Sequence, residues 1–152
     1  MKKTIISMAA CFLISMGVYA QHTETELVRS AFKLEKKAKV ASFMQLNDAD
    51  AKKFWPIYNQ YETSRSAIGD RKIKLLEDYA TAYEKGDTSK AQKLWMESSS
   101  IQKSEVALRE KYANMLKKSI SSPVALNFYM VEDFIATAIK YELYNSIPAA
   151  TN

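Results

Sequence analysis

The side chains that most often carry enzyme chemistry are scarce in this sequence. Its one cysteine, Cys11, lies in an apolar N-terminal stretch, and its one histidine, His22, follows shortly after. A zinc or copper site of the usual ligand count needs several such side chains, and nucleophilic catalysis needs an activated nucleophile beside a base. No glycine-rich phosphate-binding loop occurs. We therefore expect no catalytic residue, no metal site and no cofactor.

Neighbouring carboxylates occur twice, as Glu77-Asp78 and as Glu132-Asp133. Adjacent residues of a helix point about 100° apart, so neither pair can converge on one substrate atom. We interpret both pairs as surface charge. The sequence therefore predicts a protein that is not an enzyme.

Aromatic residues and methionine are the stronger signal. The stretches Phe54-Trp55-Pro56-Ile57-Tyr58 and Leu94-Trp95-Met96 place large side chains all around a short helical segment, so these side chains cannot all face one core. They are either core residues with ordinary scatter on the surface, or some of them line an exposed patch or a dimer interface. Such side chains suit loosely specified apolar partners. The candidates for contact with a partner protein are Phe54, Trp55, Tyr58, Trp95 and Met96.

The fold class follows from the scarcity of turn-forming residues. The chain holds three glycines and three prolines, too few for the many turns of a β-sandwich of this length. We predict an all-α fold of long helices, with residues 21–148 as a single domain and residues 149–152 as a frayed tail.

The longest predicted helix covers residues 47–84. Asn47, preceded by Leu46, is its expected N-cap, and Asp50 is the capping-box partner three residues later. Pro56 predicts either a kink or a separate short segment before it. Gly69 marks a close crossing or a bend. Apolar and aromatic residues recur at steps of three and four, among them Phe54, Ile57, Tyr58, Tyr61, Ile68, Leu75, Tyr79 and Tyr83.

Three further helices are expected. The first covers residues 23–43 and carries a cluster of lysines that either contacts an acidic partner or is a solvated face. The third follows a glycine stop at Gly86, is capped by Asp87 or Thr88 and ends near residue 119. Polar residues interrupt its apolar stripe, which indicates a partly covered helix in an open bundle. The fourth begins with Ser122 as N-cap and Pro123 as its first residue, and ends near residue 145.

The N-terminus has the pattern of a secretory signal peptide. Lys2 and Lys3 precede an apolar stretch, and small residues precede a cleavage site after Ala20. We expect residues 1–20 to be removed and the protein to be periplasmic, because polarity returns too soon for a membrane anchor. Removal lowers the basic residues from 22 to 20 against 17 acidic ones, a formal charge of +3. So mild a charge gives no reason to expect nucleic-acid binding.

These features resemble the LTxxQ family of periplasmic stress proteins, the Spy/CpxP-like group. Leu46-Asn47-Asp48-Ala49-Asp50 matches the family's helix-start motif, with asparagine for threonine and aspartate for glutamine, and Ser121-Ser122-Pro123-Val124-Ala125 is a second, weaker copy. Exported proteins known as sensors of extracytoplasmic-function sigma factors look similar around residues 54–58 and Tyr61-Glu62. The resemblance covers most of residues 46–148.

The resemblance implies four long antiparallel helices in an open, curved bundle that forms a homodimer with a concave cradle. Chaperone-type members hold unfolded proteins there without ATP, and regulatory members restrain an envelope-stress sensor. Metal binding by some members is not supported here, given a single histidine. We therefore expect a non-catalytic protein-binding module that acts as a chaperone-like binder of unfolded proteins. The alternative is a regulatory sensor or inhibitor of one specific signalling partner in the envelope.

Overall fold

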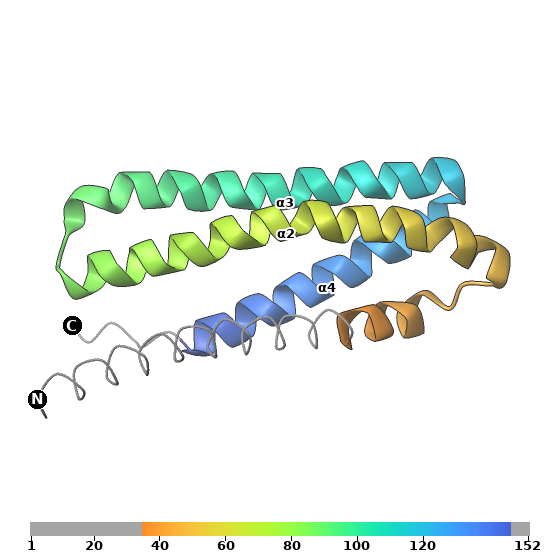
Figure 1. Ribbon diagram of the computed structural model, residues 1–152, viewed down its shortest axis with the longest axis horizontal. Helices are drawn as coiled ribbons and strands as arrows, with labels where there is room; N and C mark the ends of the chain where they lie inside the picture. The colour runs from red at the N-terminus through yellow and green to blue at the C-terminus, as the bar shows by residue number, and fades with distance from the viewer. Residues whose placement is uncertain (1–34, 147–152) are drawn as a thin grey trace, which may run out of the picture. The chain divides into compact units, whose positions relative to one another are not determined.

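The computed structural model describes residues 35–146 of the chain (Figure 1). Residues 35–44 are helical, and they are followed by α2 (Asp48–Glu84), a short 3-10 helix η1 (Thr88–Lys90), α3 (Ala91–Ser119) and α4 (Ser122–Ser146). No strand occurs in that part of the chain. The predicted all-α class is confirmed. The predicted signal peptide, the first part of the predicted helix over residues 23–43 and the frayed tail lie outside the described residues.

The chain divides into two compact units, Met1–Ser42 and Phe43–Asn152, and α2, α3 and α4 all belong to the second. Of the lysines in the predicted basic cluster, Lys39 places its Nζ 2.8 Å from Glu35 Oε1, one helical turn away. Lys36 is buried, so the interpretation of the cluster as an entirely solvated face is wrong at that position.

The start of α2 confirms the predicted cap. Asn47 has extended backbone, and its Oδ1 accepts a hydrogen bond of 2.9 Å from the Asp50 backbone N–H. Asp50 Oδ2 accepts from the Asn47 side-chain Nδ2 at 3.0 Å, whereas a capping box would have it accept from the Asn47 backbone N–H, so that part of the prediction is wrong. Leu46, directly before the cap, is half-buried. The helix then continues through Pro56 without interruption, so the alternative of a separate short segment before the proline is wrong.

The turn between α2 and α3 is a Schellman motif built on Gly86. This glycine has φ +60°, its N–H donates to the Tyr83 carbonyl, and the Asp87 N–H donates to the Ala82 carbonyl. Asp87 caps the 3-10 helix η1, because its Oδ1 accepts from the Ser89 N–H at 3.0 Å. The N-cap of α3 is Lys90, whose side chain makes no capping hydrogen bond, so the prediction that Asp87 or Thr88 caps the third long helix is wrong. The predicted glycine stop is confirmed.

The start of α4 lies one residue earlier than predicted. Ser121 Oγ accepts from the Val124 N–H at 3.4 Å, and the Ser121 carbonyl accepts from the Ala125 N–H. Ser122 is therefore the first helical residue, and Pro123 is the second. Two consecutive serines offer the same hydroxyl, so the sequence alone does not decide which of them caps the helix.

Aromatic rings form the centre of the core of the second unit. The α2 and α3 helices lie side by side and antiparallel, and α4 turns back from the end of α3 (Figure 1). The Phe128 ring of α4 lies 6.5 Å from the Phe54 ring, 6.3 Å from the Tyr58 ring and 5.1 Å from the Tyr61 ring, all on α2. The other buried apolar residues of the three helices are Ala82, Ile101, Tyr112, Leu116, Val124, Ala125 and Val131.

Gly69 lies in the interior of α2, and a Cβ added there would meet no atom within 4 Å. The alternative that it marks a close helix crossing is therefore wrong, and the alternative of a bend stays a prediction. A glycine in such a position raises the conformational entropy of the unfolded chain and so lowers the stability of the helix.

The two glycines predict opposite effects of the same substitution. Gly69→Ala should raise the free energy of unfolding by about 0.5–1 kcal/mol, because alanine is the better helix former and has room. Gly86→Ala should lower it by about 1–2 kcal/mol, because a Cβ strains the left-handed conformation. Urea unfolding of both variants measures the difference, and equal effects would contradict the assigned conformations.

Candidate partner-binding surface

A buried carboxylate joins α4 to α2. Glu132 is 2% exposed, and its two oxygens accept hydrogen bonds from the Tyr58 hydroxyl at 3.0 Å and the Tyr61 hydroxyl at 2.9 Å. The interpretation of Glu132 as surface charge is therefore wrong, because the two phenols replace the water that a carboxylate otherwise needs. Its neighbour Asp133 points elsewhere and binds Arg109 of α3, so the two carboxylates do diverge as predicted.

Both tyrosines are held in the neutral form. Burial is the main cause that raises the pKa of the Tyr58 and Tyr61 hydroxyls, and the adjacent negative charge of Glu132 raises it further. Tyr61 also packs edge-on against Tyr112 of α3, whose hydroxyl lies 3.1 Å from Ser64 Oγ. The cluster therefore connects all three helices of this unit.

This packing corrects part of the predicted partner-binding set. Phe54 is fully buried and Tyr58 is 2% exposed, so neither side chain is available to a partner at the surface. Trp55 is half-buried, and its ring lies edge-on to the Phe54 and Tyr58 rings at 5.1 and 5.6 Å. The aromatic stretch of α2 thus serves mainly to build the core, because one helical turn brings its large rings onto the face that meets α4.

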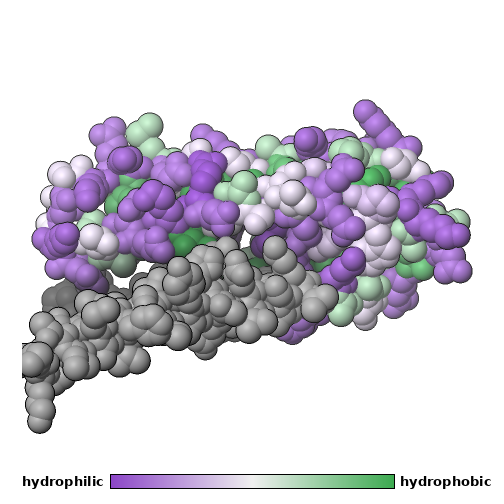
Figure 2. Space-filling view, viewed as in Figure 1, coloured by the Kyte–Doolittle hydropathy of each residue, from purple (hydrophilic) through white to green (hydrophobic). Residues whose placement is uncertain are grey.

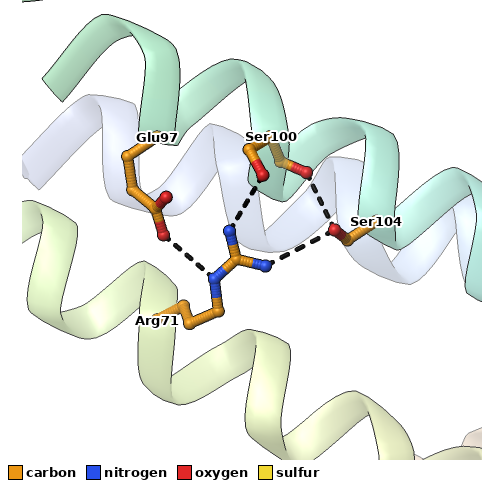
Figure 3. Close-up of polar contacts among 4 residues, drawn as sticks. All are labelled: Arg71, Glu97, Ser100 and Ser104. Carbon is orange, nitrogen blue, oxygen red and sulfur yellow. Dashed lines mark hydrogen bonds and ion pairs between the residues drawn. The ribbon is translucent and has the colours of Figure 1, made fainter. Parts of the chain in front are cut away.

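A polar contact joins α2 to α3 further along the pair, towards the Gly86 turn (Figure 3). Arg71 of α2 donates from Nε to Glu97 Oε1 at 2.9 Å and from Nη2 to Ser100 Oγ at 3.0 Å. Its Nη1 lies 3.4 Å from Ser104 Oγ, and Ser104 in turn donates to the Ser100 carbonyl. The guanidinium also lowers the pKa of the Glu97 carboxyl, chiefly through their hydrogen bond.

The neighbouring pair is Lys72 with Glu105, again between α2 and α3. Glu105 is one of the polar residues that interrupt the apolar stripe of α3, and the lysine of α2 covers it. For Arg71 and Ser100, the signal that could have revealed their contact is the number of residues that separates each of them from Gly86, which is about equal. In an antiparallel pair of helices, such residues lie opposite each other.

Trp95 and Met96 are the predicted candidates that the structure places at the surface. Trp95 is 68% exposed and Met96 is 56% exposed, both in the first turns of α3. They border a groove of about 540 Å³ that is otherwise lined by polar and small side chains. The described lining residues are Trp95, Met96, Ser99, Ser100, Lys103, Ser104 and Ala107.

Most of the other side chains that line this groove are polar. The face of the molecule in Figure 2 is largely hydrophilic, with hydrophobic side chains in small, separate patches. Lys103 makes no ion pair with any described residue, so its charge is available at the groove. The groove can therefore bind an apolar side chain next to a polar or acidic group.

Comparison with known proteins identifies no relative of this chain. No family model, curated protein or solved structure matches this chain. Within residues 35–146, no group of three or more histidine, cysteine, aspartate or glutamate side chains is arranged to hold a metal ion. None of the helices in that range is both long and apolar enough to cross a bilayer.

The Tyr58–Tyr61–Glu132 cluster predicts that the fold weakens in alkali. Up to pH of about 10 both the folded and the unfolded chain keep the phenol protons, so the two tyrosines give no pH dependence. Above it the unfolded chain loses them while the folded chain retains them. The free energy of unfolding should then fall by about 1.4 kcal/mol per pH unit for each tyrosine.

Urea unfolding between pH 9 and pH 11 measures this slope. The control is Tyr58→Phe/Tyr61→Phe, which keeps the rings and removes both titrating groups, and should therefore show a shallower decline. Identical slopes for this variant and the original chain would contradict the assignment of the two phenols.

Proposed function

We propose that this protein is an exported, non-catalytic protein-binding module of the envelope-stress type. It binds exposed segments of unfolded proteins without ATP and so limits their aggregation. The observation that carries the proposal is the exposure of Trp95 and Met96 beside a groove on α3. Adjacent large apolar side chains that form one exposed patch can mark an interaction site, whereas single exposed ones are common on folded domains.

The chemistry of the groove supports a binder of varied polypeptides. Methionine is flexible and polarizable, and tryptophan offers a large apolar face with one hydrogen-bond donor. Serine hydroxyls and the Lys103 ammonium lie among them and can pair with the backbone or with acidic side chains of a client. The signal-peptide pattern of residues 1–20 supports action in the periplasm.

The alternative is a regulatory module that binds one specific signalling partner in the envelope. The small number of exposed apolar side chains at the groove, Trp95 and Met96, favours it, because a defined contact needs less apolar area than general capture of clients. The two functions differ in what a pull-down from an envelope extract recovers. A regulator should retain one dominant membrane protein, and a chaperone-like binder should retain many unfolded proteins.

A light-scattering assay tests the chaperone-like function and its site together. The protein should suppress aggregation of an unrelated, heat-denatured client at about stoichiometric ratio. Trp95→Ala/Met96→Ala should lose most of this suppression and change the free energy of unfolding by no more than about 0.5 kcal/mol, because both side chains are exposed.

The matched control is Tyr79→Ala/Tyr83→Ala, which removes two exposed rings of α2 that stack on each other at 6.3 Å. It should keep the suppression. Full suppression by the Trp95→Ala/Met96→Ala variant would show that the groove is not the binding site. No suppression by the original chain would count against the chaperone-like function itself.

A further inference from the structure

The α4 helix has a second apolar face that sequence reasoning missed. Its inward face carries Val124, Phe128 and Val131, all buried. On the opposite side Leu126 is 60% exposed, Met130 37%, Phe134 54% and Tyr141 65%. Side chains at these positions lie within one narrow arc, because each residue turns the helix by about 100°. In this unit the inward face of α4 packs against the other helices, and the outward face is left in contact with water.

The outward face has the spacing of a coiled-coil seam. Met130, Phe134, Thr137 and Tyr141 follow one another at steps of four, three and four, which are the a and d positions of a heptad. Thr137 is the one member that is neither aromatic nor methionine, and it is small and exposed. Their stretch of helix is about 17 Å long. Such spacing favours a straight helix as the partner, with side chains packed in layers.

We propose that this outward face of α4 binds a second copy of this chain, with the two α4 helices antiparallel about a two-fold axis. In that register Met130 meets the partner's Tyr141. Phe134 meets the partner's Thr137, where a small side chain with a methyl group leaves room for the ring. Because the two-fold axis repeats both contacts, the interface has four layers of paired side chains. The inference goes beyond the proposed function and does not depend on it.

The charged residues beside the seam favour an antiparallel second copy of the chain as the partner. Asp133 and Lys140 are exposed at the same flanking position of successive heptads. An antiparallel second copy places Asp133 against the partner's Lys140, and Lys140 against the partner's Asp133. A parallel copy would instead set Asp133 against the partner's Ala138, so the charge would gain no counterion. Asp133 also binds Arg109, but its side chain is 51% exposed and keeps room for a second cation.

The small area that this contact would bury indicates a weak dimer. Four layers of a single helix pair bury less than the roughly 1,200 Å² of a standard stable interface. We therefore expect a reversible dimer that dissociates in the micromolar range or above. This area would not support a permanent dimer.

Disulfide cross-linking tests the register directly. In a background with Cys11→Ser, Met130→Cys and Tyr141→Cys variants are made separately, one of them with a size tag, and mixed under mild oxidation. The mixture should form the mixed disulfide, because the register brings these two positions together. Met130→Cys alone should not cross-link, because its two copies lie about 17 Å apart along the axis, beyond disulfide reach. Cross-linking of Met130→Cys alone, or none in the mixture, would overturn the proposal.

Sedimentation equilibrium from about 5 µM to about 500 µM, a range chosen to bracket a micromolar dissociation constant, gives the second measurement. The original chain should show a monomer–dimer equilibrium, and Phe134→Glu or Lys140→Glu should weaken it at least tenfold with helix content unchanged. The control Val106→Glu alters another exposed apolar position, on α3, and should not shift the equilibrium. A monomer at all concentrations, or a dimer indifferent to Phe134→Glu, would overturn the proposal.

Discussion

The two hydrogen bonds that Glu132 accepts from Tyr58 and Tyr61 are the contact on which the arrangement of α4 depends. The α4 backbone packs against α3, whereas it reaches α2 through long side chains, Phe128 and Glu132 above all. A ring can slide or tilt in an apolar core, but a buried carboxylate needs its donors in place. The pair of hydrogen bonds therefore fixes the rotation of α4 about its axis. That rotation leaves Met130 and Phe134 facing outwards.

The contact between α2 and α3 is apolar at one end and polar at the other. Tyr61 packs against Tyr112 in the core, whereas nearer the Gly86 turn Arg71 and Glu97 meet as a half-exposed ion pair. Half-exposed ion pairs add little stability and weaken with salt. The turn end of the pair should consequently open more readily than the core end. Trp95 lies at that end, where local opening would let the proposed binding surface adapt to varied polypeptides.

Local chemistry in the sequence predicted much of this fold, and interactions between distant residues were largely missed. The scarcity of glycine and proline predicted the all-α class. The cap at Asn47 follows from its side-chain oxygen, and the cap at Gly86 follows from the absence of a side chain. The partners of Glu132 lie more than 70 residues away, so its neighbours in sequence indicate nothing about its burial. The same reasoning selected Trp95, which lies at the surface, and Phe54, which is buried, because periodicity alone does not reveal which face a third helix will cover. The resemblance to the LTxxQ family stays a prediction.

A double-mutant cycle between the tyrosines and Glu132 tests the central contact most directly. The free energy of unfolding is measured for the original chain, Tyr58→Phe/Tyr61→Phe, Glu132→Leu and the combination of all three. Each change alone removes one side of the two hydrogen bonds, whereas the combination removes both sides together. We predict a coupling free energy of about 1–3 kcal/mol, with the combined variant more stable than the sum of the separate losses implies. Strict additivity would show that the carboxylate and the phenols do not hold α4 in place.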